Sequence, residues 1–249
     1  MNNKLRYILH LADNALILGH RLSEWCGHGP VLEQDMAMTN IALDLVGQAR
    51  SLYQYAAEVE GKGNSENDLA YLRDALDFRN VLLVELPNQD FAYTVIRQFL
   101  FDTFNYYNYK ALTQSNDTQL AAIAEKSLKE VTYHLRWSSE WTIRLGDGTE
   151  ESHRRIQTAL NDYWVYTGEL CAPSPLDIAA SEARYGSDLT AIQPLWENHI
   201  SKILAKATLQ QPEKGWMQSG GKTGEHTEYL GFILADMQFL QRAYPGAEW

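Results

Sequence analysis

Cysteine is scarce in this sequence: Cys26 and Cys171 are the two among 249 residues. Two thiols are too few for a disulfide framework, and they lack the paired spacing of a zinc site. Long apolar runs are missing as well, since no window approaches the ~20 consecutive apolar residues of a membrane helix. Arg6, His10 and Asp13 interrupt the N-terminal segment where a signal peptide would need an apolar core. We therefore expect packed thiols in a reducing cytoplasm and no membrane span.

Basic side chains are outnumbered by acidic ones. The chain has 21 Lys and Arg against 32 Asp and Glu, which gives a formal net charge of −11 at pH 7. This balance argues against nucleic acid or an anionic membrane as the main partner. It suits solubility, and it suits docking onto a basic patch of another protein. The chain is long enough to bury a substantial core, as one large domain or two small ones.

Alternation of apolar and polar residues with a period of two is also lacking, so half-buried strands are not expected. VLLVEL at 81–86 is the one strand-like stretch, and it has no second strand to pair with. Long segments with helical periodicity, separated by clusters of glycine and proline, predict an all-α protein. The expected helices cover about residues 3–26, 31–60, 66–76, 89–115, 117–146, 150–170, 188–209 and 225–243. Residues 171–187 and 210–224 are expected to form two long loops.

The order of the long helices favours a ferritin-like four-helix bundle with additional C-terminal helices. About 30 residues separate the second long helix from the third, and that connection is what two parallel neighbours in a bundle require. A simple up-down bundle would need only a short turn there. We therefore expect a single ferritin-like domain over 1–249, with a core bundle at about 3–146 and accessory helices at about 150–243.

Two of these helices carry polar residues on stripes that should face the interior. One stripe consists of Ile41, Leu45, Gln48, Leu52, Tyr55 and Val59, and the other of Leu120, Ile123, Ser127, Glu130, His134, Trp137, Trp141 and Leu145. Steps of three and four residues keep each stripe on one face of its helix. Gln48 is the polar member of the first stripe, whereas Glu130 and His134 lie one turn apart on the second.

These polar residues look like a di-metal carboxylate site that has lost ligands. A di-iron bundle of this type needs a Glu-x-x-His pair on each of two helices. Here Leu45 stands three residues before Gln48, and Val131 stands three residues before His134. We interpret Leu45, Gln48, Glu130, Val131 and His134 as degenerate metal-site positions, and we expect no bound metal and no catalytic residue in this chain.

Two interpretations of this interior stay open. In the first, His134, Glu130, Gln48 and an aspartate hydrogen-bond one another, because an unpaired buried polar group costs ~1–3 kcal/mol. In the second, the chain is an independent di-metal carboxylate oxygenase or oxidase with an atypical Asp-rich site. That site would consist of Asp13, Asp44, Asp102, Glu130 and His134.

The remaining motifs indicate no chemistry of their own. GGKTG at 220–224 is not a phosphate-binding loop, because Trp216 occupies the position of the first required glycine. We expect a flexible loop that carries Lys222. The histidines outside the second stripe, His226 among them, are expected at the surface or at helix caps. The aromatic stretch 101–110 has aromatic residues all round its helix, which predicts burial against another helix layer or another subunit.

Four stretches resemble one family. They are LADNALILGHRLSEWCGHGP, NIALDLVGQARSLYQYAAE, KEVTYHLRW and GGKTGEHTEYLGFILADMQFLQRAYPGAEW. Together they are similar to the C-type (PaaC) subunits of ring-1,2-phenylacetyl-CoA epoxidases of aerobic phenylacetate degradation, from Leu5 to Trp249. Tyr229 and Asp236 depart from that pattern, where His and Glu would be usual.

The resemblance implies a ferritin-like subunit that pairs with an A-type sister subunit of the same fold. The sister subunit would hold the di-iron centre and epoxidise phenylacetyl-CoA, with Glu and His at the positions of Leu45 and Gln48, and again at those of Val131 and His134. The C-type subunit would have a structural role and no cofactor. A reductase with FAD and an iron–sulfur centre would deliver electrons from NADPH to the complex, which contains further epoxidase subunits.

The resemblance also places contacts with the acyl-CoA substrate on two segments. They match Asp77, Phe78, Arg79 and Asn80 in DFRN, and Ile178, Ala179 and Ala180 in LDIAA. In the first segment, Arg79 offers a forked donor for phosphate and Phe78 a face for stacking. The alternative is that Asp77 or Asn80 merely caps a turn before VLLVEL. The second segment rests on the resemblance alone.

Overall fold

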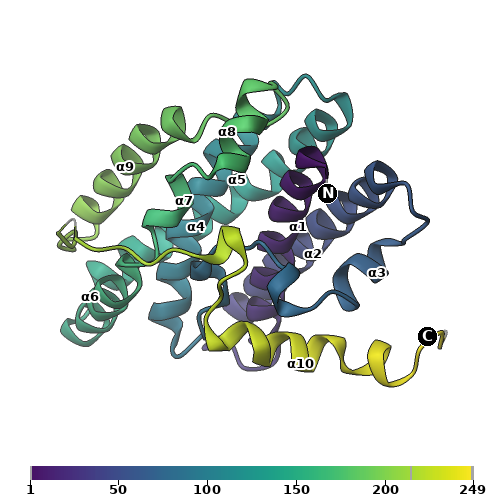
Figure 1. The fold of residues 1–249 in the computed structure, drawn as a ribbon. Helices are drawn as coiled ribbons and strands as arrows, with labels where there is room; N and C mark the ends of the chain where they lie inside the picture. The colour runs from purple at the N-terminus through teal and green to yellow at the C-terminus, as the bar shows by residue number, and fades with distance from the viewer. Residues whose placement is uncertain (1, 214, 248–249) are drawn as a thin grey trace. The chain divides into compact units, whose positions relative to one another are not determined.

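The computed structural model describes residues 2–213 and 215–247, and helices form most of this part of the chain (Figure 1). The α-helices are α1 (Asn3–Ser23), α2 (Leu32–Glu60), α3 (Glu66–Tyr71), α4 (Phe91–Leu112), α5 (Thr118–Gly146), α6 (Glu150–Trp164), α7 (Gly168–Cys171), α8 (Pro175–Glu182), α9 (Leu189–Lys206) and α10 (Glu228–Ala243). Short 3₁₀ helices are η1 (Ala75–Asp77), η2 (Leu82–Glu85) and η3 (Gly221–Thr223). Within the described ranges no β-strand is present, which confirms the all-α prediction. The strand-like residues 81–86 instead contain η2.

The chain divides into two compact units. The first consists of residues 1–87 and 220–249, and the second of residues 88–219. Each unit contains one pair of long packed helices, α1 with α2 and α4 with α5, and residues 61–90 connect the two pairs. This is the helix order expected of the ferritin-like fold. That the whole chain forms a single domain stays a prediction.

In the first unit, α1 is buried on nearly every side. Its residues 7–18 are all buried, and they include the polar His10, Asp13 and Asn14. Gly19 lets α2 come close, because a Cβ there would lie 3.3 Å from Leu45 Cβ. The C-terminal helix α10 returns to this unit and packs on α3, η1, η2 and α1 (Figure 1).

In the second unit, α4 is surrounded by other helices. It packs on α5, α6, α7 and α9, and the Trp196 indole N–H on α9 donates to the Leu100 carbonyl at 3.0 Å. The expectation that the aromatic stretch 101–110 is covered by another helix layer is therefore confirmed. None of the helices in the described ranges has both the length and the apolar character that crossing a membrane requires.

The prediction of a loop over residues 171–187 is wrong, because this stretch contains the two-turn helix α8. Ser174 caps this helix by accepting from Asp177 N, and the Asp177 carboxylate in turn accepts from Ser174 N at 2.8 Å. Pro175 stands in the first turn of this helix. A proline is tolerated there, because the N–H groups of the first turn have no carbonyl partner within the helix. The prolines that suggested a loop instead mark the start of a helix.

Candidate functional site: an arginine-lined pocket and a polar interior

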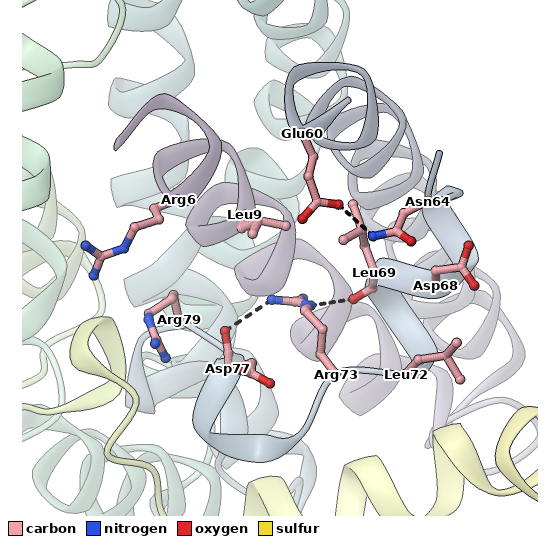
Figure 2. A pocket seen from close by; sticks show the side chains of 10 residues that line it. All are labelled: Arg6, Leu9, Glu60, Asn64, Asp68, Leu69, Leu72, Arg73, Asp77 and Arg79. Atoms are coloured by element: carbon pink, nitrogen blue, oxygen red, sulfur yellow. Dashed lines mark hydrogen bonds between the residues drawn. The ribbon is translucent and has the colours of Figure 1, made fainter. Parts of the chain in front are cut away.

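A pocket of about 340 Å³ opens in the first unit, between α1, the end of α2, α3 and the segment that follows α3. Its lining residues are Arg6, Leu9, Glu60, Asn64, Asp68, Leu69, Leu72, Arg73, Asp77 and Arg79. Figure 2 shows Arg6 and Arg79 at one side and Glu60, Asn64 and Asp68 at the other. The pocket therefore has a cationic end and an acidic, amide-bearing end.

Arg73 is a structural cation at the base of this pocket. It forms an ion pair with Asp13, whose side chain is fully buried, and its guanidinium lies 4.2 Å from the centre of the Phe78 ring. Burial opposes the charge of Arg73, but the neighbouring Asp13 carboxylate outweighs it and raises the pKa above its ordinary value. Arg73 thus stabilises the positions of Asp13 and Phe78.

Arg79 and Arg6 are the other two arginines that line the pocket. The Arg79 side chain is half-buried, and its Nη1 donates to the Leu76 and Phe78 carbonyls at 2.6 Å each. Burial, and next the positive charge of Arg6, lower the pKa of Arg79, although a guanidinium stays charged at neutral pH. An anion would offset the repulsion between the two charges, and a phosphate group matches the forked donors of arginine.

Side chains of α1 hold the backbone of residues 79–81. Arg79 N donates to Asp13 Oδ2 at 2.8 Å, and His10 Nδ1 lies 2.6 Å from the Arg79 carbonyl oxygen. Asn14 Oδ1 accepts from Val81 N at 2.8 Å. Sequence reasoning missed this role, although the spacing of residues 10, 13 and 14 on one helix face was a usable signal.

The predicted DFRN contacts divide into exposed and buried side chains. Asp77 is exposed and also accepts from Asp74 N at 3.3 Å, so its capping role is confirmed. Asn80 is fully buried, and its amide donates to Glu85 Oε1 at 2.8 Å. The stacking role of Phe78 is wrong, because this side chain is fully buried beneath the Arg73 guanidinium. Of the four DFRN residues, Arg79 and Asp77 have side chains that a substrate could contact.

The second predicted segment, LDIAA, lies on α8 in the other unit. Ile178 is half-exposed, Ala179 is intermediate and Ala180 is fully buried. This segment therefore offers the side chain of Ile178 and little else. Its role in substrate binding stays a prediction.

A buried polar cluster occupies the middle of the second unit. Asp102 on α4 and His134 on α5 are both fully buried, and the Gln98 amide donates to Asp102 Oδ1 at 3.1 Å. Burial raises the pKa of Asp102 to about 7, although His134, Ser138 and Arg97 oppose the shift. Gln98 was missed from the sequence, and its signal is the four-residue spacing to Asp102 on a buried helix.

The five degenerate metal-site positions fit a di-iron centre poorly. Leu45, Val131 and His134 are fully buried and Gln48 nearly so, whereas Glu130 is only half-buried. The prediction that Glu130 lies on the buried side of its helix is thus wrong, because its neighbour Val131 takes the buried position. Leu45 and Val131 carry no ligand atoms where carboxylates would be needed. Across residues 2–213 and 215–247, no three His, Cys, Asp or Glu side chains are grouped as metal ligands. The metal prediction itself stays a prediction.

Asp13, a proposed ligand of the Asp-rich alternative, is already occupied. Its Oδ1 accepts from the Tyr53 hydroxyl at 2.6 Å and from Arg73, and its Oδ2 accepts from Arg79 N. Asp44 is half-exposed on α2. Both observations count against the Asp-rich site.

A family model and a known protein both match the full length of the chain. The family model described as "Phenylacetic acid catabolic protein" matches residues 1–249. The chain belongs to this family. It is also 47% identical over 249 residues to the C-type subunit of the 1,2-phenylacetyl-CoA epoxidase of Escherichia coli strain K12, covering 100% of both chains. The resemblance noted from the sequence is thereby confirmed, although Glu248 and Trp249 at its end lie outside the described residues.

Proposed function

We propose that this chain is a non-catalytic structural subunit of a 1,2-phenylacetyl-CoA epoxidase complex, and that it contacts the CoA part of the substrate through the Arg79 pocket. The observation that carries the proposal is the coincidence of two independent features. Two residues of the DFRN segment singled out by family resemblance, Asp77 and Arg79, line a pocket in which Arg6 lies at the same side as Arg79 (Figure 2). CoA carries several phosphates, which forked guanidinium donors recognise.

The proposal includes partners and cofactors outside this chain. An A-type sister subunit holds the di-iron centre, and a reductase with FAD and an iron–sulfur centre supplies electrons from NADPH. The fully buried Leu45 and Val131 support this division of labour, since these positions cannot ligate iron here. The complex operates in the cytoplasm.

The CoA contact is tested by replacing Arg79 with glutamine. Removing one charge-assisted contact, worth ~1.5–3 kcal/mol, should weaken coenzyme A binding to the full-length chain by about 10–100-fold in calorimetric titration. The matched control is Arg136→Gln, which removes an exposed arginine of α5 in the other unit. Equal affinities of wild type and Arg79→Gln would contradict the assignment.

The non-catalytic role is tested by restoring ligands. The purified wild-type chain should contain iron far below stoichiometry, and a triple variant with Leu45→Glu, Gln48→His and Val131→Glu should bind more, by elemental analysis. The control is Leu43→Glu, which adds a carboxylate to an exposed position of α2. Stoichiometric di-iron in the wild type, with consumption of dioxygen, would instead establish the independent oxygenase.

A further inference from the structure

The carboxylate of Glu85 is fully buried and is held by the segment that precedes α10. Glu85 Oε2 accepts from Thr227 N at 2.9 Å and from Thr227 Oγ1 at 2.6 Å. Its Oε1 accepts from the Asn80 amide at 2.8 Å and lies 2.5 Å from His226 Nδ1. One buried side chain thus links the C-terminal segment to the DFRN segment, more than 140 residues earlier in the chain.

The imidazole of His226 lies between two acceptors. Opposite the Glu85 carboxylate, His226 Nε2 lies 3.0 Å from the Phe78 carbonyl oxygen. A carboxylate and a carbonyl only accept, so both ring nitrogens must carry protons to make these bonds. Beside an ionised Glu85 carboxylate the geometry therefore favours an imidazolium, in a side chain that is 5% exposed. The expectation that His226 has a surface or capping role is wrong.

The loop before His226 lies against the same segment. Gly224 has φ +96°, and a Cβ on it would lie 2.5 Å from Arg79 Nη1 and 2.8 Å from the Leu76 carbonyl oxygen. Lys222, which was expected in a flexible loop, is buried. The GGKTG stretch packs over the Arg79 guanidinium, and only a residue without a side chain fits this approach.

We propose that His226, as a protonated imidazolium, is a positioning residue that sets the orientation of Arg79 for the anionic ligand. The peptide unit between Phe78 and Arg79 is bonded at both ends: its carbonyl faces His226 Nε2, and its N–H donates to Asp13. Asp13 is anchored by Arg73, and His226 is anchored by Glu85. Without the His226 bond, the Phe78 carbonyl keeps the hydrogen bond from Arg79 Nη1 but is no longer tied to the C-terminal segment. The inference rests on the proposed CoA contact of Arg79.

The charges around His226 give the positioning a defined pH dependence. Glu85 on η2 faces the ring directly, Asp13 on α1 is the next acidic group, and Arg73 and Arg79 are the cations beside them. Burial lowers the pKa of His226, but Glu85, the Phe78 carbonyl and Asp13 outweigh it, so the pKa is raised above 6.5. The bonded imidazolium therefore persists to a higher pH than that of an ordinary histidine, and it is lost as the pH rises through the raised pKa.

The first readout needs no ligand. In nuclear magnetic resonance spectra of the full-length chain, the His226 ring nitrogens should have imidazolium shifts at neutral pH, and the Arg79 amide should titrate together with them. The Arg79 amide should shift in His226→Gln and lose this titration, while the control His28→Gln, an exposed histidine, leaves it unchanged. An Arg79 amide that is the same in wild type and His226→Gln would overturn the positioning role.

The second readout is the affinity for coenzyme A against pH. Wild-type affinity should fall about tenfold as the His226 ring loses its proton, a size typical of coupling between neighbouring sites. His226→Gln should bind with the lower affinity throughout and lack that step. The titration of the CoA phosphates affects both proteins equally and cancels in their ratio. If Arg79→Gln does weaken coenzyme A binding, wild-type binding without the step would overturn the inference.

The failure of the proposed function has a different signature. If wild type and Arg79→Gln bind coenzyme A equally, the CoA contact is wrong, and the Arg79 amide alone decides whether His226 positions this segment. If His226→Gln folds poorly, Glu85→Gln provides a second variant, because it removes the carboxylate and should lower the pKa of His226. A His226 pKa unchanged by Glu85→Gln would then count against the proposal.

Discussion

Asp102 shows how one side chain keeps a buried interior polar. Its carboxyl is fully buried on α4 beside His134 and Gln98, and its pKa is raised to about 7. Burial is the main cause, because moving a carboxylate out of water disfavours its charged form. The folded chain therefore holds a proton on Asp102 over a pH range in which the unfolded chain has released it.

This difference predicts a pH-dependent stability. Asp102 contributes most at and below its ordinary pKa of 3.8, and its contribution falls as the pH rises toward 7, because the unfolded state binds fewer protons than the folded state in that range. The Asp102→Asn variant has no carboxyl to ionise, so its stability should not fall in this way. Between about pH 5 and about pH 8, the free energy of unfolding of the variant, relative to that of the wild type, should therefore rise by a few kcal/mol, since each pKa unit corresponds to ~1.4 kcal/mol. Urea unfolding at the two pH values measures it.

The control for this experiment is Asp236→Asn, an exposed aspartate of α10. It should follow the wild type at both pH values. An Asp102→Asn variant whose stability relative to wild type is the same at both pH values would show that the carboxyl is ionised in the folded protein.

At the scale of elements, periodicity predicted every long helix and the short α3, but it failed for η2 and α8. The stripe of α2 with Leu45 and Gln48 is buried as expected, because one helix face can be read from spacing alone. η2 was mistaken for strand-like, since four to six apolar residues have no visible period. α8 was mistaken for a loop, although Ser174 and Asp177 form the capping pattern that could have indicated it.

The candidate site was predictable only in part, for a physical reason. Arg79 could be named because a family pattern marks its segment. The contacts that hold it come from His10, Asp13 and His226, which are 66 or more residues away in sequence. Spacing along a helix shows which residues share a face, but it does not show which distant loop that face will meet.

At the scale of the whole molecule, the first unit is built from two separate parts of the chain. Residues 220–249 supply three of the groups around the Glu85 carboxylate, namely the ring of His226 and both donors of Thr227. Without them a fully buried carboxylate would be left with the Asn80 amide, and such a group is costly to leave unsatisfied. The C-terminal segment is therefore part of the core of this unit.

Ending the chain after Ser219 should destabilise the first unit selectively. Amide hydrogen exchange should accelerate through α1, α2 and α3, while α4, α5 and α9 in the other unit keep most of their protection. A chain that ends after Ala243 retains α10 and serves as the control. Equal loss of protection in both units would show that they unfold as one.

The divided first unit has a consequence for synthesis on the ribosome. Domains generally fold as their sequences emerge, N-terminal parts first. Here residues 1–87 emerge early but remain incomplete until the final 30 or so residues have been translated. A nascent chain that stalls before that point would display an unfinished N-terminal part, which chaperones and proteases recognise through its uncovered apolar surface. Only full-length translation products would then be available for assembly.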